Sequence, residues 1–184
     1  MYKMSYVKRS MIAAVCIALC VVLPMAFHAI HNAGRILLPM HIPVLLAGLI
    51  CGWPLGFLVG LVGPFLATMF TGMPPMAIMP RMMVELATFG LVTGLVMQFI
   101  RTKNTYADLY ISLIAGMLAG RIIAGFANAL IFFRGSYAIA MWVTSYFVNA
   151  LPGIIVQIIL LPSIVFALEK ARLIPTRYPN KISE

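Results

Sequence analysis

Residues 107–133 read ADLYISLIAGMLAGRIIAGFANALIFF, and this stretch decides the fold class. A helix needs about 20 mostly apolar residues to cross the hydrocarbon core of a bilayer, and this run exceeds that length. The whole chain has the same character, because 63% of its 184 residues are apolar, 9% are charged and the mean hydropathy is +1.05. Soluble domains have about 25% charged residues, so the composition excludes a water-soluble globular enzyme. It predicts an all-α integral membrane protein.

Breaks between the apolar runs predict a single membrane domain over residues 1–184, a compact bundle of six transmembrane helices. The breaks include a Gly-Trp-Pro turn at 52–54 and a loop rich in Gly and Pro at 71–75. The first run is longer than the apolar part of a signal peptide and no small-residue cleavage site follows it, so we expect it to be retained. A bend is expected in the last helix at Pro152 or Pro162. The predicted spans are residues 10–30, 42–52, 54–70, 76–100, 107–133 and 138–168.

The net charge of +9 indicates the orientation of the bundle and no nucleic-acid partner. Cytoplasmic loops of membrane proteins are rich in Lys and Arg. With the N-terminus in the cytoplasm, six spans leave only Arg35 and Arg134 in the outside loops. We therefore predict that both termini are cytoplasmic. The basic residues that this orientation places inside are Lys3, Lys8, Arg9, Arg101, Lys103, Lys170, Arg172, Arg177 and Lys181.

Polar residues inside the predicted spans are the main functional signal, because burying them in a bilayer is costly. They fall at a similar depth, toward the outer ends of the last three spans. Their spacings of three, four or seven residues place them on shared helix faces. We therefore expect them to form a substrate-binding site. The candidates are Arg81, Glu85, Arg121, Asn128, Trp142, Tyr146 and Asn149.

Among these candidates, two arginines face a single carboxylate. Arg81 and Arg121 with Glu85 leave one positive charge over if all three are ionised. A buried surplus cation favours an anion, and the guanidinium fork of arginine suits a carboxylate or a phosphate. An anionic group on the ligand is therefore expected. The alternative is that Glu85 pairs with one of the arginines only to hold the helices together.

Small residues on the helices predict close packing. Glycines recur every four residues from Gly48 to Gly60, a pattern that lets membrane helices approach closely. Ala14 and Ala18 form a similar stripe on the first span. That stripe could receive another helix of this protein or a helix of a partner, and composition alone leaves both open.

Other chemistry is less well supported. His28, His31 and His41 flank the first outside loop, and with 14 methionines in the chain they leave haem or corrinoid binding as an alternative. We predict no metal site. No phosphate-binding Gly-x-x-x-x-Gly-Lys loop is present, so ATP is not bound by that means. Rival classes are a structural subunit without a ligand pocket and an integral membrane enzyme that uses Glu85 with the two arginines.

Several motifs in order resemble the S components of energy-coupling factor (ECF) transporters. They are PMHIPVLLAG at 39–48, the Gly- and Pro-rich helix that follows, TGMPP at 71–75 and VELATFG at 84–90. The resemblance implies a multi-pass protein of a bacterial-type cell membrane that captures a vitamin or related micronutrient from outside, with no enzymatic activity. It also implies a transmembrane coupling (T) subunit and two ATPase subunits as partners. Those subunits use ATP, and no cofactor is expected in this chain.

The same resemblance implies roles for particular residues. It assigns Ala14 and Ala18 to the interface with the T subunit, and it places the ligand pocket at the outer end of the last three helices. His41 and residues 73–75 would cap that pocket. The branch that looks closest contains pantothenate and vitamin B6-type importers. Pantothenate would use the surplus positive charge, whereas a phosphate-free pyridine would not require it.

Overall fold

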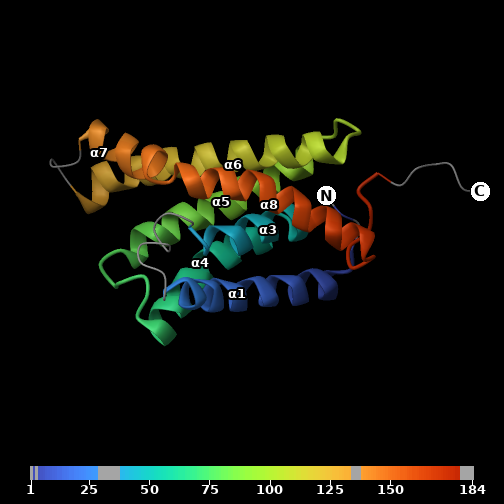
Figure 1. The fold of residues 1–184 in the computed structure, drawn as a ribbon, viewed down its shortest axis with the longest axis horizontal. Helices are drawn as coiled ribbons and strands as arrows, with labels where there is room; N and C mark the ends of the chain where they lie inside the picture. The colour runs from blue at the N-terminus through green and yellow to red at the C-terminus, as the bar shows by residue number, and fades with distance from the viewer. Residues whose placement is uncertain (1, 3, 29–37, 134–137, 179–184) are drawn as a thin grey trace, which may run out of the picture.

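The computed structural model describes residues 2, 4–28, 38–133 and 138–178, and every regular element within these ranges is helical. The predicted all-α class is therefore confirmed. Figure 1 shows the helices packed side by side along the long axis of the molecule. Two π-helical segments, η1 (Asn128–Phe132) and η2 (Thr144–Val148), extend α6 and α7. The α-helices are α1 (Tyr6–His28), α3 (His41–Cys51), α4 (Trp53–Thr71), α5 (Met79–Phe99), α6 (Thr105–Ala127), α7 (Ile139–Val143) and α8 (Leu151–Lys170).

The sequence predicts six spans of unequal length, and not all of them are helices that could cross a membrane. Within the described residues, five helices are long and apolar enough to cross a membrane: α1, α4, α5, α6 with η1, and α8. The predicted span 42–52 is α3, which has 11 residues. At 1.5 Å per residue α3 is about 17 Å long, short of the roughly 30 Å hydrocarbon core.

The predicted span 138–168 is not one helix. A turn at Asn149 and Ala150 separates α7 and η2 from α8. Pro152 stands in the first turn of α8, where a missing N–H leaves no helical hydrogen bond unmade. Instead of a bend at Pro152, the helix is interrupted just before this residue. Pro162, the other expected position, lies inside α8.

Local sequence sets two of the reversals between helices. Gly52 has a φ of +89°, a conformation that favours glycine, and it lets α3 turn directly into α4. Asn104 caps α6, because its side-chain oxygen accepts a hydrogen bond from the N–H of Tyr106 at 3.0 Å. These short connections keep α3 beside α4 and α5 beside α6.

Helix α5 lies in the middle of the bundle, in contact with α3, α4 and α6. Glycines allow its close approach to α4. A Cβ atom built on Gly90 would lie 2.1 Å from the carbonyl oxygen of Gly56, and one on Gly60 would lie 2.3 Å from that of Leu86. Any larger residue would force the two backbones apart. The glycine repeat is therefore a packing feature, as the sequence indicates.

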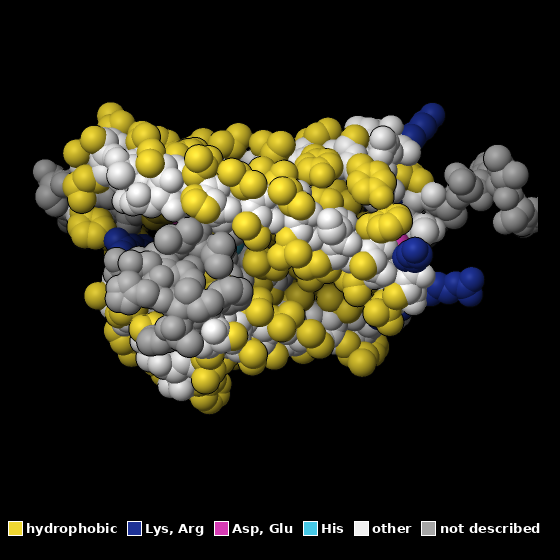
Figure 2. Space-filling view, viewed as in Figure 1, with side chains coloured by type: hydrophobic (Ala, Val, Ile, Leu, Met, Phe, Trp, Pro, Cys, Tyr) yellow, Lys and Arg dark blue, Asp and Glu magenta, His cyan; other side chains and the backbone are white. Residues whose placement is uncertain are grey.

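The two ends of the bundle differ in charge. The start of α1, the residues after α8 and the α5–α6 turn lie at one end, which we call the terminal end (Figure 1). The opposite end carries the α4–α5 loop, η1 and α7, and we call it the site end. Figure 2 shows Lys and Arg side chains mainly at the terminal end and apolar side chains along most of this face. The structure thus separates basic and apolar surface along the bundle axis.

A buried polar cluster closes the terminal end. Nε of Arg177 lies 2.7 Å from Oδ2 of Asp108, and these side chains are 2% and 0% exposed. Nη2 of Arg177 donates to the carbonyl oxygen of Met97 at 2.9 Å, and the hydroxyl of Tyr178 donates to Asp108 at 2.5 Å. The segment after α8 therefore fastens the end of α5 to the start of α6.

Candidate ligand-binding site

The two π-helical segments meet at the site end through one hydrogen bond. Nδ2 of Asn128 in η1 donates to the hydroxyl oxygen of Tyr146 in η2 at 2.9 Å. In a π-helix each N–H pairs with the carbonyl five residues before it, as Phe133 does with Asn128 at 2.8 Å. Such turns are rare and occur frequently at functional sites. The structure thus brings two of the sequence-predicted residues together at two unusual turns.

Arg121 is a buried charge beside this pair, at 2% exposure. Nε donates to the carbonyl oxygen of Tyr146 at 2.9 Å, and Nη1 donates to that of Met117 at 3.1 Å. The guanidinium lies 5.4 Å from the centre of the Phe89 ring. Nη2 has no hydrogen-bond partner, and no carboxylate of the described residues forms an ion pair with Arg121. The buried guanidinium therefore has one donor, Nη2, that no described residue uses.

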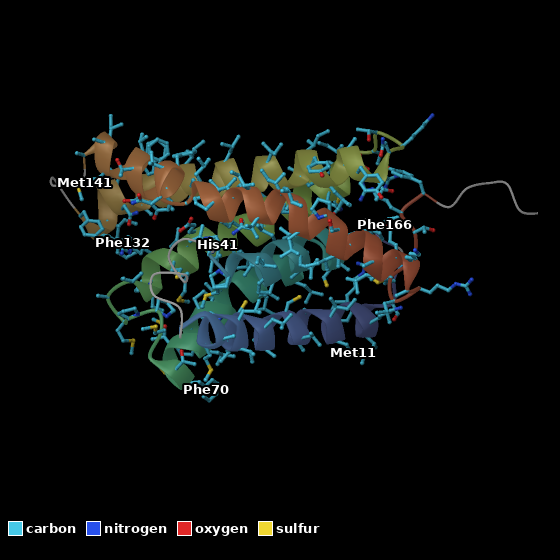
Figure 3. The ribbon with its side chains drawn as sticks, viewed as in Figure 1. Met11, His41, Phe70, Phe132, Met141 and Phe166 are labelled. Carbon is cyan, nitrogen blue, oxygen red and sulfur yellow. The ribbon has the colours of Figure 1, made fainter. Side chains whose placement is uncertain are left out.

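Glu85 pairs with His41, and with neither arginine. Nε2 of His41, at the start of α3, lies 3.6 Å from Oε1 of Glu85 in α5, and both residues are buried. The ring of His41 packs against that of Phe89, with 5.3 Å between centres. Figure 3 shows His41 in the interior of the bundle. The alternative that Glu85 forms an ion pair with Arg81 or Arg121 is therefore not seen among the described residues.

Arg81 lies at the rim of the site. It is half-buried in the first turn of α5, and its guanidinium lies 5.5 Å from the centre of the Phe133 ring at the end of η1. Glu85 is one helical turn further along α5, but its side chain reaches α3. Arg81 lies against Phe133 at the end of η1, whereas Glu85 lies against His41 of α3. The four-residue spacing of Arg81 and Glu85 therefore does not bring their side chains into an ion pair.

Trp142 in α7 covers Arg121. Its Nε1 donates to the carbonyl oxygen of Arg121 at 3.0 Å, and its ring packs edge-on against that of Phe147 at 5.2 Å. Gly125 leaves room for this ring, because a Cβ atom there would lie 2.5 Å from Nε1. Asn149 is not brought to the cluster, since it is exposed in the turn before α8. The prediction assumed α-helical spacing over 142–149, whereas η2 pairs each N–H five residues back and shifts the positions that follow.

A further polar side chain belongs to this region and was not predicted. Gln157 in α8 is fully buried, and its Nε2 lies 3.5 Å from the carbonyl oxygen of Leu38. The N–H of His41 donates to the same carbonyl at 3.0 Å. The available signal was a lone amide in the middle of the most apolar span, where burial is costly.

Other sequence candidates lie away from this cluster. Ala14 and Ala18 are exposed on α1, so in the described part of the chain no other helix covers them. The side chain of His28 and the whole of His31 lie outside the described residues. Among the residues that are described, no group of three or more His, Cys, Asp or Glu side chains could hold a metal ion.

The long apolar helices define a multi-pass membrane protein. A family model for the substrate-specific component of ECF transporters matches residues 8–165, from the first turn of α1 to most of α8. The chain belongs to this family of ECF transporter substrate-specific components, so the resemblance carried by the sequence motifs is confirmed. Comparisons with curated proteins and with solved structures find no match.

Proposed function

We propose that this chain is the S component of an ECF-type importer and that it captures a small vitamin-like anion at the site end. Family membership supports the transport role. One observation carries the ligand class: Arg121 is buried, Nη2 is unused, and no carboxylate of the described residues pairs with it. An unpaired buried charge is costly, and a carboxylate or phosphate accepting from Nη2 offsets that cost.

The remaining candidates take supporting roles in this proposal. Arg81 at the rim attracts the anion, and Trp142 offers a ring face to the body of the ligand. The pair of His41 and Glu85 forms the polar wall on the α3 side. Asn149 stays at the periphery. With Arg121, Asn128 and Tyr146, these residues are the proposed substrate-binding set.

The cluster is closed in this structure, so ligand entry requires one covering element to move. We assign that movement to α7 and η2, which contain no buried residue. They join α8 through the turn at Asn149 and Ala150, and they contact Arg121 and Asn128 through the few hydrogen bonds described above. Such a segment separates from α6 at low cost.

Pantothenate is the proposed cargo, because it combines a carboxylate with hydroxyl and amide groups. A B6-type vitamin is the alternative that needs no anion subsite. Haem or corrinoid binding gains no support, because His41 is engaged with Glu85 and no described group of residues forms a metal-ligand set. The rival membrane enzyme gains none either, because no ion pair among the described residues joins Glu85 to Arg81 or Arg121.

The proposed partners follow from the family. They are a transmembrane T subunit that docks on α1 at Ala14 and Ala18, and two ATPase subunits that use ATP. We propose a bacterial plasma membrane location with both termini in the cytoplasm. The basic residues at the terminal end support that orientation.

The test is titration of the purified, detergent-solubilised protein with a panel of vitamins, read by calorimetry and by thermal unfolding. We expect pantothenate, or another vitamin anion, to bind and to raise the Tm. Arg121→Gln should weaken that binding by about 10- to 100-fold, the value of a hydrogen bond to a charged group. Arg101→Gln, an exposed arginine at the terminal end, is the control and should change nothing. Preference for an uncharged vitamin with unchanged affinity in Arg121→Gln would contradict the proposal.

A further inference from the structure

Three buried side chains at the site end each leave one polar atom without a hydrogen-bond partner. The atoms are Nη2 of Arg121, Nδ1 of His41 and Oε1 of Gln157, and none of these residues is more than 2% exposed. They come from three helices, α6, α3 and α8. Arg121 and His41 both pack on Phe89, at 5.4 and 5.3 Å from its ring centre. Gln157 lies beside the start of α3, because its Nε2 and the N–H of His41 share the carbonyl oxygen of Leu38, and α3, α6 and α8 contact one another.

The orientation of the Gln157 amide follows from its neighbour. The carbonyl oxygen of Leu38 is an acceptor, so only the NH₂ group of the amide can face it favourably. The structure has Nε2 on that side, 3.5 Å away. The amide oxygen therefore points away from Leu38. It is an acceptor without a donor in the interior of the bundle, where buried polar atoms are normally satisfied.

We propose that Gln157 determines ligand specificity, because its Oε1 accepts a hydrogen bond from a hydroxyl or amide N–H of the bound molecule. This inference rests on the proposed function and narrows its substrate class. The ligand carries an anionic group for Arg121 and, at a separate position, a neutral hydrogen-bond donor for Gln157. An anion without such a donor leaves the amide oxygen unpaired in the complex and is selected against.

The experiment measures the affinity of the purified full chain for pantothenate and for two analogues. One analogue has both hydroxyls replaced by hydrogen, and the other has its amide nitrogen methylated. The variant is Gln157→Met, which keeps the shape of the side chain and removes the acceptor. Ser163→Ala is the matched control on the same helix, because its hydroxyl only bonds back to the carbonyl of Ile159 at 2.8 Å.

Gln157→Met should weaken pantothenate binding by about tenfold, the value of one neutral hydrogen bond. The analogue that lacks the hydrogen-bond donor to Gln157 should bind wild type and Gln157→Met with equal affinity. A merely structural role would lower the affinity for all three ligands together, and that result overturns the inference. If Gln157→Met does not fold, Gln157→Asn replaces it, because its shorter side chain keeps the amide but moves it away from the ligand. The affinities for the three ligands are then compared in the same way.

The two proposals fail separately. If wild type binds none of the vitamin anions, the proposed function fails and this inference with it. If wild type binds pantothenate and Gln157→Met binds it equally well, only the role of Gln157 is refuted.

Discussion

Nε of Arg121 donates to the carbonyl oxygen of Tyr146 at 2.9 Å, so the arginine assigned to the ligand also fastens α6 to η2. Trp142 adds a second link by donating to the carbonyl oxygen of Arg121 at 3.0 Å. Because both contacts involve Arg121, we expect α7 and η2 to shift when a ligand binds this residue.

Trp142 should report ligand binding by fluorescence. The chain has two tryptophans, and Trp53 lies at the start of α4, at the terminal end and far from the site. In the Trp53→Phe variant, pantothenate should change the emission of Trp142, because the indole environment changes when α7 moves. The change should saturate with the calorimetric Kd. A change that appears in Trp142→Phe and not in Trp53→Phe would contradict the proposed movement.

Tyr146→Phe removes the hydroxyl that accepts from Asn128. We expect a loss of about 1 kcal/mol in the free energy of unfolding, the value of one hydrogen bond between neutral side chains. Unfolding in mixed micelles measures it. Tyr110→Phe is the control, because Tyr110 is 38% exposed on α6 and its loss should be near zero. Equal stability of the two variants would show that the π-helical segments are not held by this bond.

Gly90→Ala should destabilise the bundle by about 1–3 kcal/mol or more, the range for overpacking. The added Cβ would meet backbone, since the carbonyl oxygen of Gly56 is 2.1 Å away. Gly63→Ala is the milder control, because its Cβ would meet no backbone atom and only the side chain of Cys20, with Sγ at 2.8 Å and Cβ at 3.0 Å. Thermal unfolding of the two variants should therefore differ clearly, and equal losses would argue against close α4–α5 contact.

Arg177→Met should destabilise the terminal end by about 1.5–3 kcal/mol, the value of a hydrogen bond to a charged group, because Tyr178 and Thr102 still donate to the Asp108 carboxylate. The double variant with Asp108→Asn should recover part of this loss. Lys170→Met, an exposed lysine at the end of α8, is the control. The affinity for ligand should be unchanged in these variants, because the proposed site lies at the opposite end of the bundle. If Arg177→Met alone is as stable as wild type, the terminal cluster does not hold α5 and α6 together.

Ala14→Trp combined with Ala18→Trp should abolish uptake by cells that express the complete transporter. Both positions are exposed on α1, so vitamin binding by the isolated chain should be unaffected. Ile159→Trp places the same bulk on an exposed position of α8 and should leave uptake intact. Normal uptake by the double variant would contradict the proposal that the T subunit docks on α1.

The sequence predicted the helical membrane class well, because long apolar runs have few other stable states in a bilayer. Helix ends marked by Gly52 and Asn104 also follow from local chemistry. The last span was predicted less well. Its apolar pattern continues through Asn149, and composition alone does not show that the backbone pairs five residues back in η2 and turns before Pro152.

Contacts between site residues were also predicted only in part. Arg121, Asn128 and Tyr146 were expected together, and the structure joins them by direct hydrogen bonds. The partner of Glu85 was missed, because His41 is distant in sequence and only the packing of α3 on α5 makes them neighbours. Gln157 was missed for a different reason, since its isolation in an apolar helix was a signal that went unused.

The most direct test of the central claim is mass spectrometry of the small molecule retained by the purified protein, compared between wild type and Arg121→Gln. The account predicts that wild type retains a small anion bearing hydroxyl or amide groups, and that Arg121→Gln retains none of it. Recovery of lipid alone from wild type, or of the same molecule in equal amount from both proteins, would contradict the account.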